Sequence, residues 1–130
     1  MIVTLSAAQV VALHGELLKS FGGRGGLRDR AALEAAVGRP GMTFGGEDLY
    51  PDLATKAAAL MHSLVVNHPY VDGNKRVGAA AAELVVEVNG HRLRASDAQL
   101  EGVTFSVARG EMTAEALAIW FRQRMEPLSE

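Results

Sequence analysis

Two apolar segments joined by a short polar loop constrain the fold of this chain more than any other feature. Residues 52–67 and 75–89 both carry apolar side chains every three or four positions, the spacing of a buried helical face. These side chains are Leu53, Ala57, Leu60, Met61 and Leu64 in the first segment, and Val77, Ala81, Leu84, Val85 and Val88 in the second. Pro69 disfavours a helical conformation at His68, and Gly90 suits the turn after a helix. The sequence therefore predicts two packed central helices joined by a loop.

The second central helix begins near Asn74, and its first turn carries two cations, Lys75 and Arg76. The partial positive charge of a helix N-terminus disfavours exposed cations there, by about 0.3–1 kcal/mol each. A bound phosphate would reverse this penalty, because it accepts hydrogen bonds from the N–H groups after Gly73 and from both side chains. Asn74 could serve as the helix cap or as a further ligand. We therefore expect residues 73–76 to form a phosphate site.

Two residues of the loop supply further groups that phosphate chemistry uses. Asp72 lies beside the expected phosphate site, and such a carboxylate commonly binds a magnesium ion that also contacts phosphate oxygens. His68 lies four positions earlier, and a neutral imidazole can accept a proton from an attacking hydroxyl group near neutral pH. With the two cations, these residues predict phosphoryl or nucleotidyl transfer.

Each of these residues also has a purely structural interpretation. His68 could be a polar residue that ends a helix, Asp72-Gly73 an ordinary turn, and Lys75-Arg76 a solvated first turn. All of them lie between positions 68 and 76, at the start of one helix. Their occurrence together favours the functional interpretation.

Length and composition limit the class of protein. A chain of 130 residues suits a single domain, residues 1–130, with its own core. The absence of cysteine excludes disulfides, thiol nucleophiles and cysteine-bound zinc. A net charge of −2 argues against a protein that mainly binds nucleic acid. No apolar run is long enough to span a membrane, and no Lys or Arg precedes Lys19, so we expect a cytoplasmic protein.

Four further helices are expected outside the central pair, each starting at a residue type that caps helix N-termini. The capping residues are Ser6, Asp29, Ser96 or Asp97, and Thr113. Residues 91–94 are expected to form a short connector, and the tail from Pro127 to be frayed. The predicted fold is all-α: a compact single-domain bundle of about six helices with the active-site loop between the two central ones.

We predict no catalytic role for His14 or for the two long loops, residues 21–28 and 41–50. We expect His14 to lie off the apolar face of the first helix and to have a structural role. The glycine-rich residues 21–28 match neither the dinucleotide fingerprint nor the Walker A spacing, and we expect Arg28 to be mainly structural. Residues 41–50 could flank the active site. Their large apolar side chains could cover the core or form a docking surface for a partner, and we expect them to join the core. These side chains are Met42, Phe44 and Tyr50.

The stretch His68–Arg76 resembles the signature of the Fic/Doc family, His-x-Phe-x-Asp/Glu-Gly/Ala-Asn-Lys/Gly-Arg. Tyr70 stands where the family has Phe, and residues 26–40 are similar to the N-terminal half of Doc-like chains. Lys75, in place of the glycine of the nucleotide-transferring Fic branch, resembles the death-on-curing (Doc) branch. Ala79 stands where Fic AMP-transferases carry a second arginine. Both differences point to a Doc-type chain.

The resemblance implies a toxin of a toxin-antitoxin system, a kinase that transfers the γ-phosphate of ATP to a threonine of elongation factor Tu and so arrests translation. By family analogy His68 is the catalytic base, Asp72 the Mg²⁺ ligand, and Gly73, Asn74, Lys75 and Arg76 the phosphate cradle. The expected partner is a separate antitoxin whose disordered tail folds onto the toxin.

Two alternatives stay open. One is transfer of AMP or another phosphate-linked group, with Lys75 tolerated in a way that the Doc pattern does not suggest. Val77-Gly78 also replaces the Thr-Ala usual in Doc proteins, which leaves the substrate preference open. The other is a catalytically silent module that only binds a partner. The presence of both His68 and Asp72 weighs against it, because their loss would be its signature.

Overall fold

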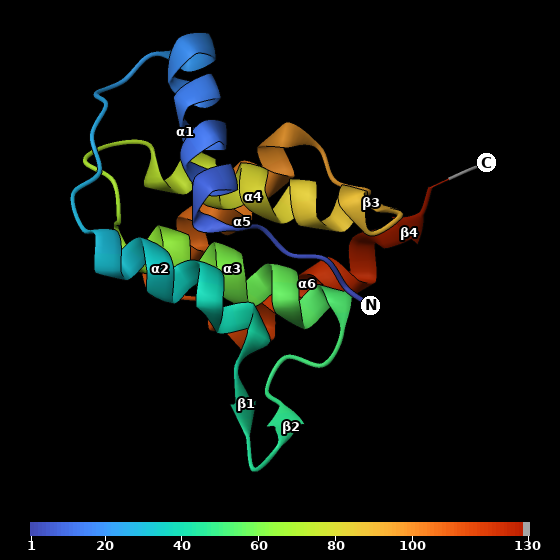
Figure 1. The fold of residues 1–130 in the computed structure, drawn as a ribbon. Coiled ribbons are helices and arrows are strands. Elements are labelled where there is room, and N and C mark those ends of the chain that lie inside the picture. Colours follow the sequence, from blue (N-terminus) through green and yellow to red (C-terminus); the bar gives the residue numbers. More distant parts are fainter. Residues whose placement is uncertain (129–130) are drawn as a thin grey trace.

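The computed structural model describes residues 1–128, and within them the chain forms six α-helices and two small antiparallel sheets (Figure 1). The helices are α1 (Ala7–Phe21), α2 (Arg30–Gly38), α3 (Leu53–Asn67), α4 (Asn74–Val88), α5 (Asp97–Ala108) and α6 (Ala114–Arg124). A short 3₁₀ helix, Arg39–Gly41, follows α2. The strands are β1 (Thr43–Phe44) paired with β2 (Glu47–Asp48), and β3 (His91–Leu93) paired with β4 (Met125–Pro127). The predicted all-α fold with six helices is confirmed.

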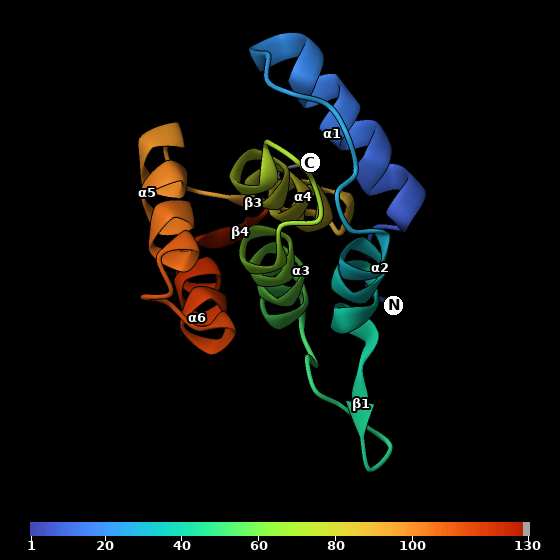
Figure 2. The same cartoon turned by 90° about the vertical axis from the view of Figure 1, so that its left-hand side faces the viewer.

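Helices α3 and α4 form the centre of the bundle, as the apolar spacing predicted. Figure 2 shows them between α1 and α2 on one side and α5 and α6 on the other. Helix α3 contacts α2, α4, α5 and α6, and most of its side chains are buried. A helix that is apolar on several sides needs neighbours on several sides, because each exposed apolar face would cost hydrophobic free energy.

Gly78 allows the close approach of the two central helices. A Cβ atom at this position would lie 2.6 Å from Val65 Cγ2 and 3.4 Å from the carbonyl oxygen of Met61, both on α3. Small residues at a helix crossing bring the helix axes together. The backbone of α4 therefore packs directly onto α3, and this contact fixes where both helices end at the loop.

The predicted caps Ser6, Asp29, Ser96 and Thr113 are found, and Asp52, which was not predicted, caps α3. Ser6, Asp29, Asp52, Ser96 and Thr113 each accept a hydrogen bond from a backbone N–H of the first turn of their helix. The exception is α4, whose cap is Gly73 in the left-handed conformation, with φ 83°, and without a side-chain bond. Asn74 is the first residue of α4 and is not its cap.

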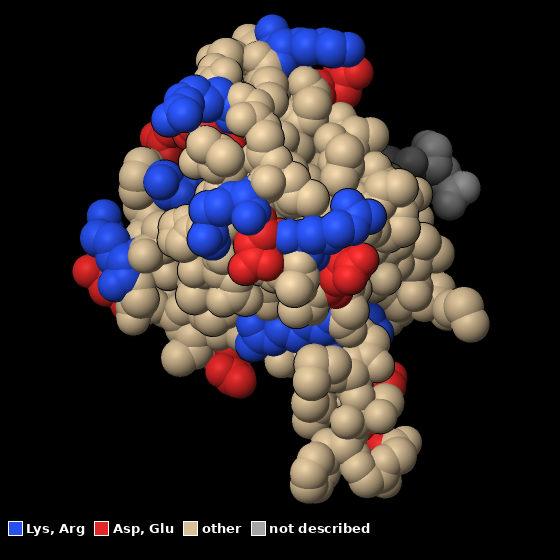
Figure 3. All heavy atoms as spheres, turned by 60° about the vertical axis from the view of Figure 1, so that its left-hand side comes forward, with Lys and Arg blue, Asp and Glu red and all other residues tan. Residues whose placement is uncertain are grey.

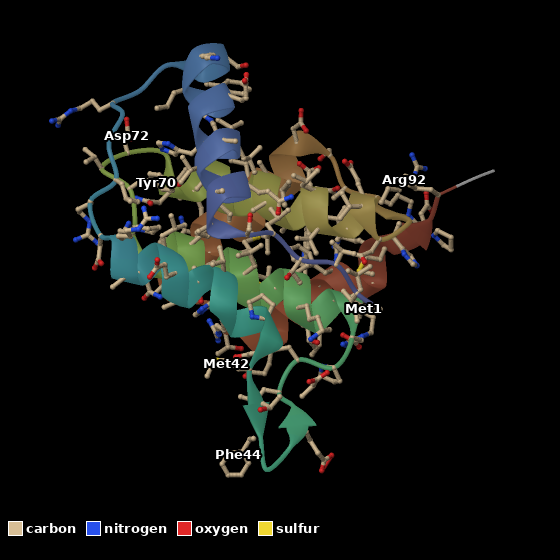
Figure 4. All side chains as sticks on the ribbon, viewed as in Figure 1. Met1, Met42, Phe44, Tyr70, Asp72 and Arg92 are labelled. Carbon is tan, nitrogen blue, oxygen red and sulfur yellow. The ribbon has the colours of Figure 1, made fainter. Side chains whose placement is uncertain are left out.

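The prediction for residues 41–50 is wrong on two points. This segment forms the β1–β2 hairpin, in which Met42 and Phe44 are 50% and 79% exposed, so neither joins the core. Figure 4 places Phe44 at the tip of the hairpin, on the other side of α2 and α3 from Asp72. The hairpin therefore does not border the loop between α3 and α4. The segment is short, and it turns at Gly45-Gly46 so that β1 pairs with β2. Its side chains therefore do not cover the bundle.

The C-terminal segment is better ordered than we expected. Residues 91–93 do not form a plain connector but pair as β3 with β4, and Arg92 forms an ion pair with Glu126 across this sheet. The N-terminal segment joins the same region, because the side-chain amide of Asn89 bonds to both backbone polar groups of Val3. These bonds hold the end of α4 that is remote from the loop. Residues 129 and 130 of the expected frayed tail lie outside the described residues.

Arg39 organises a polar cluster beneath α3. Its guanidinium donates hydrogen bonds to the Tyr50 hydroxyl at 2.8 Å, to Ser63 Oγ at 3.0 Å and to His62 Nδ1 at 3.1 Å. Because arginine only donates, His62 Nδ1 must be unprotonated to accept. Burial, together with the positive charge of Arg39, holds the pKa of His62 below its usual value, against an opposing effect of Glu115.

None of the helices among residues 1–128 has both the length and the apolar character that crossing a bilayer requires.

We expect Gly78→Ala to lower the free energy of unfolding by about 1–3 kcal/mol, because its new methyl group overlaps Val65 and forces α3 and α4 apart. Gly15→Ala is the matched control. Gly15 also lies inside a helix, but no atom lies within 4 Å of its added Cβ, so this change should stabilise the protein by about 0.5–1 kcal/mol. Urea denaturation of both variants measures the difference, and equal effects would contradict the close packing.

We expect the free energy of unfolding to fall as the pH drops below about 6.5, because His62 then takes up a proton in the unfolded chain before it does so in the folded one. His62→Asn keeps an acceptor for Arg39 and removes this titration. Its unfolding free energy should therefore depend less on pH between about 7 and 5. His91→Asn, at a histidine in β3, should retain the wild-type pH dependence. Denaturation at several pH values tests this, and parallel curves for wild type and His62→Asn would refute it.

Candidate active site

The loop between α3 and α4 is closed by the side chain of Asn74. Its Oδ1 accepts a hydrogen bond from Tyr70 N at 2.9 Å, and its Nδ2 donates one to Tyr70 O, also at 2.9 Å. Asn74 is only 9% exposed. An asparagine side chain that bonds to both backbone groups of one residue holds a loop in shape, as backbone hydrogen bonds do in a regular turn. Its phosphate-binding role stays a prediction, but its loop-closing role was not visible in the sequence.

The glycine-rich segment after α1 runs alongside this loop and braces it. Arg28 N and Asp29 N both donate to Pro69 O, at 2.7 and 3.0 Å, and Val71 N donates to Gly26 O at 3.0 Å. The Arg28 guanidinium also bonds to the carbonyl groups of Asn67 and His68 at the end of α3. Cations are favourable at helix C-termini because they satisfy free carbonyls. The structural role predicted for Arg28 is confirmed.

His68 ends α3 in the left-handed conformation, with φ 48° and ψ 61°. It is the one non-glycine residue with positive φ among residues 1–128, and such strain gathers at functional sites. Its side chain is exposed, and its Nδ1 lies 3.5 Å from Asn74 Nδ2. At that length the contact orients the ring only weakly, and the role of His68 as a base stays a prediction.

Asp72 presents an oriented carboxylate at the other end of the loop. Oδ2 accepts from Arg24 N at 3.0 Å, and Oδ1 accepts from Gly73 N at 2.9 Å. These two backbone bonds hold the pKa of Asp72 below its usual value, assisted by the charges of Arg24 and Arg76. The side chain is therefore ionised and held in place at neutral pH.

The donor set around Asp72 fits Mg²⁺ better than a transition metal. Among the described residues, no group of three or more His, Cys, Asp or Glu side chains could hold a metal ion. Magnesium needs no such group, because it binds through one or two carboxylates, several waters and phosphate oxygens of a substrate. An exposed carboxylate with lone pairs beyond its two hydrogen bonds meets that requirement.

The first turn of α4 keeps its two cations free of carboxylates. Within residues 1–128 neither Lys75 nor Arg76 forms an ion pair, and no acidic residue lies in that turn. Instead, Lys75 Nζ lies 5.6 Å from the ring centroid of Phe105, and Arg76 Cζ lies 4.5 Å from that of Phe21. These contacts hold both cations at the helix start, where they attract an anion.

A small pocket of about 140 Å³ opens beside the loop. Its lining comes from α1, the glycine-rich segment, the loop between α3 and α4 and the first turn of α4. It consists of His14, Leu17, Leu18, Phe21, Gly22, Gly23, Asp72, Gly73 and Arg76. Pockets that enclose whole small molecules measure about 300–1,000 Å³, so this one suits only part of a ligand. It unites Asp72, Gly73 and Arg76 from the predicted set, while His68, Asn74 and Lys75 lie outside its lining.

Figure 3 brings forward the side of the molecule that faces left in Figure 1. The glycine-rich segment after α1 and the loop between α3 and α4 lie on this side. Lys and Arg side chains are spread over this face, with acidic side chains between them. The overall charge of −2 is therefore compatible with many cations on this face.

The prediction that His14 lies off the buried face of α1 is wrong. His14 is 5% exposed, and its ring is stacked on Tyr70, with 3.7 Å between the centroids and 9° between the planes. Its position four residues after the fully buried Val10 could have revealed this, because residues at that spacing share a helix face.

The Tyr70 hydroxyl is buried without a hydrogen-bond partner among the described residues, and burial raises the pKa of Tyr70.

Comparison with known proteins identifies the family of the chain. The model of the Fic/DOC family matches residues 4–86. A protein named toxin Doc, from Mycolicibacterium smegmatis (strain ATCC 700084 / mc(2)155), is 51% identical over 76 residues, which is 58% of this chain and 58% of that protein. Protein kinase doc from Escherichia phage P1 is 28% identical over 119 residues, 92% of this chain and 93% of the phage protein. The chain belongs to the Fic/DOC family, as its resemblance predicted.

We expect Gly23→Ala to displace the glycine-rich segment from Asp72. The added Cβ would lie 2.9 Å from Asp72 Oδ2, and the bond from Arg24 N would be lost. The pKa of Asp72 should then rise toward its usual value, which carboxyl ¹³C NMR titration measures. Gly22→Ala is the control, because Gly22 also has positive φ but meets no atom within 4 Å. An unchanged Asp72 pKa in Gly23→Ala would show that this contact does not hold the carboxylate.

Proposed function

We propose that this protein transfers the γ-phosphate of ATP to a hydroxyl group of a protein substrate. The observation that carries the proposal is the start of α4, where free backbone N–H groups and two cations without carboxylate partners adjoin an oriented carboxylate. Phosphoryl transfer depends almost entirely on positioning and electrostatic stabilisation, so a rigid cationic cradle supplies most of what the reaction needs.

Each residue of the site has a distinct role in this proposal. The N–H groups that follow Gly73, in the first turn of α4, bind phosphate oxygens, assisted by Lys75 as a point charge and by Arg76 as a two-pronged donor. Asp72 would hold Mg²⁺, which supplies positive charge that neutralises the phosphate oxygens when bound. His68 accepts the proton of the substrate hydroxyl group, and Asn74 keeps the loop in shape.

The kinase reaction is favoured over AMP transfer by two residues and one relative. Lys75 occupies the position at which the nucleotide-transferring Fic branch has glycine, and Ala79 replaces that branch's second arginine. The phage relative, aligned over nearly the whole chain, is named a protein kinase. We therefore propose ATP as the donor and a Ser/Thr kinase-like activity.

The relatives also suggest the biological setting. The mycobacterial relative is named a toxin, and we propose that this chain likewise acts as a cytoplasmic toxin. Its target would be a threonine of elongation factor Tu, whose phosphorylation arrests translation. A separate antitoxin would neutralise it, through a tail that folds on binding.

The proposal is tested by incubating the protein with labelled ATP, Mg²⁺ and elongation factor Tu, followed by mass spectrometry of the products. We expect one added phosphate on a threonine. His68→Ala should reduce its rate of formation by about 100-fold or more, because it removes the base. His91→Ala, a change in β3 away from the loop, should leave the rate unchanged.

Other products would lead to other conclusions. An AMP adduct would assign the protein to the transferase branch despite Lys75. If neither this factor nor a whole cell extract acquired label, while ATP still bound, the protein would be a silent binding module and the kinase proposal would be wrong.

A further inference from the structure

His14 of α1 reaches the backbone of the active-site loop. Its Nε2 lies 2.8 Å from the carbonyl oxygen of Asp72. A carbonyl can only accept, so Nε2 carries the proton of this bond in either charge state of the ring. The ring is held by its flat stack on Tyr70, whose backbone is in turn fixed by Asn74. Figure 4 shows Tyr70 and Asp72 close to α1.

The hydrogen bond from His14 fixes the direction of a peptide plane. In a trans peptide unit the C=O and N–H bonds point in opposite directions. With the Asp72 carbonyl turned toward α1, the Gly73 N–H must point away from it, and there it donates to Asp72 Oδ1. The position of the carboxylate therefore depends on His14 through one rigid peptide unit.

The ring of His14 packs closely against Gly73. A Cβ atom on Gly73 would lie 3.3 Å from His14 Nε2, tighter than an ordinary van der Waals contact, and Gly73 has φ 83°. His14 also lines the same pocket as Asp72, Gly73 and Arg76. The histidine is thus part of the wall of the site, and not only a core residue of α1.

We propose that His14 is a positioning residue, which orients the Asp72 carboxylate for the metal-bound phosphates of the donor nucleotide. This inference rests on the proposed function, since it assigns Asp72 to Mg²⁺ and ATP. His14 itself transfers no proton in the reaction. Its contribution is to hold the Asp72-Gly73 peptide, so a side chain that donates an N–H at the same place should substitute for it.

Two variants separate the hydrogen bond from the stacking. His14→Phe keeps a flat ring on Tyr70 and lacks the donor, whereas His14→Gln keeps a donor and lacks the ring. His91→Phe is the matched control, because His91 also contacts a backbone carbonyl, that of Asn89, but at the remote end of α4. Thermal unfolding confirms that each variant is folded before it is used.

The first measurement is amide hydrogen exchange at Gly73 and Arg24, whose N–H groups hold the Asp72 carboxylate. We expect faster exchange in His14→Phe and near wild-type exchange in His14→Gln and His91→Phe. Unchanged exchange in His14→Phe would overturn the inference, because the peptide would then be held without His14.

The second measurement is binding of Mn²⁺ and ATP, followed by the EPR signal of free Mn²⁺. Removing a group that orients a metal ligand typically weakens metal binding by about 10–100-fold, and we expect this in His14→Phe but less than about threefold in His14→Gln. Equal losses in both variants would assign His14 a packing role only and overturn the inference. If the wild type bound no Mn²⁺ with ATP while exchange at Gly73 still depended on His14, the proposed function would fail and the role of His14 in holding the peptide would stand.

Discussion

The contact between α3 and α4 at Gly78 is the constraint on which the rest of the structure depends. The backbone of α4 at Gly78 contacts side chains of α3 there, so the relative position of the two helices tolerates little change. The loop that joins them spans only residues 68–73, and its ends are therefore fixed by the core. The outer helices then cover the apolar faces that the central pair leaves open. A rigid pair of helices with a short connection is a suitable support for a site that acts by positioning charges.

The site is built from backbone groups as much as from side chains. Carbonyls of Asn67, His68 and Pro69 are all bonded by the segment that follows α1. The carboxylate of Asp72 is held by N–H groups from both segments. Side chains that would usually bind ligands, such as Asn74 and Arg28, are used here to shape the loop. The groups left free are those that a phosphate or a hydroxyl group would need, namely the helix N-terminus, the cations of its first turn and the imidazole of His68.

The sequence predicted the helices, and it predicted that the candidate site lies in the loop between α3 and α4, because both predictions use local patterns. Apolar spacing located α3 and α4, and capping residues located most helix starts. The bracing segment was not predicted, because its bonds to the loop join residues about forty positions apart through backbone atoms, which carry no side-chain signature. His14 was misplaced for a related reason. A polar residue on an apolar face has a partner that only the folded chain reveals. The hairpin after α2 was misjudged because large apolar side chains are also found on surfaces.

The buried Tyr70 hydroxyl has a consequence for the evolution of this loop. Within the described residues it has no hydrogen-bond partner, and an unsatisfied buried hydroxyl costs about 1–3 kcal/mol of stability. The family signature has phenylalanine at this position, which would bury the same ring without that cost. The chain therefore carries a less stabilising residue in the loop between α3 and α4, stacked on His14. A lineage that carries this tyrosine has less stability in reserve to absorb further destabilising substitutions.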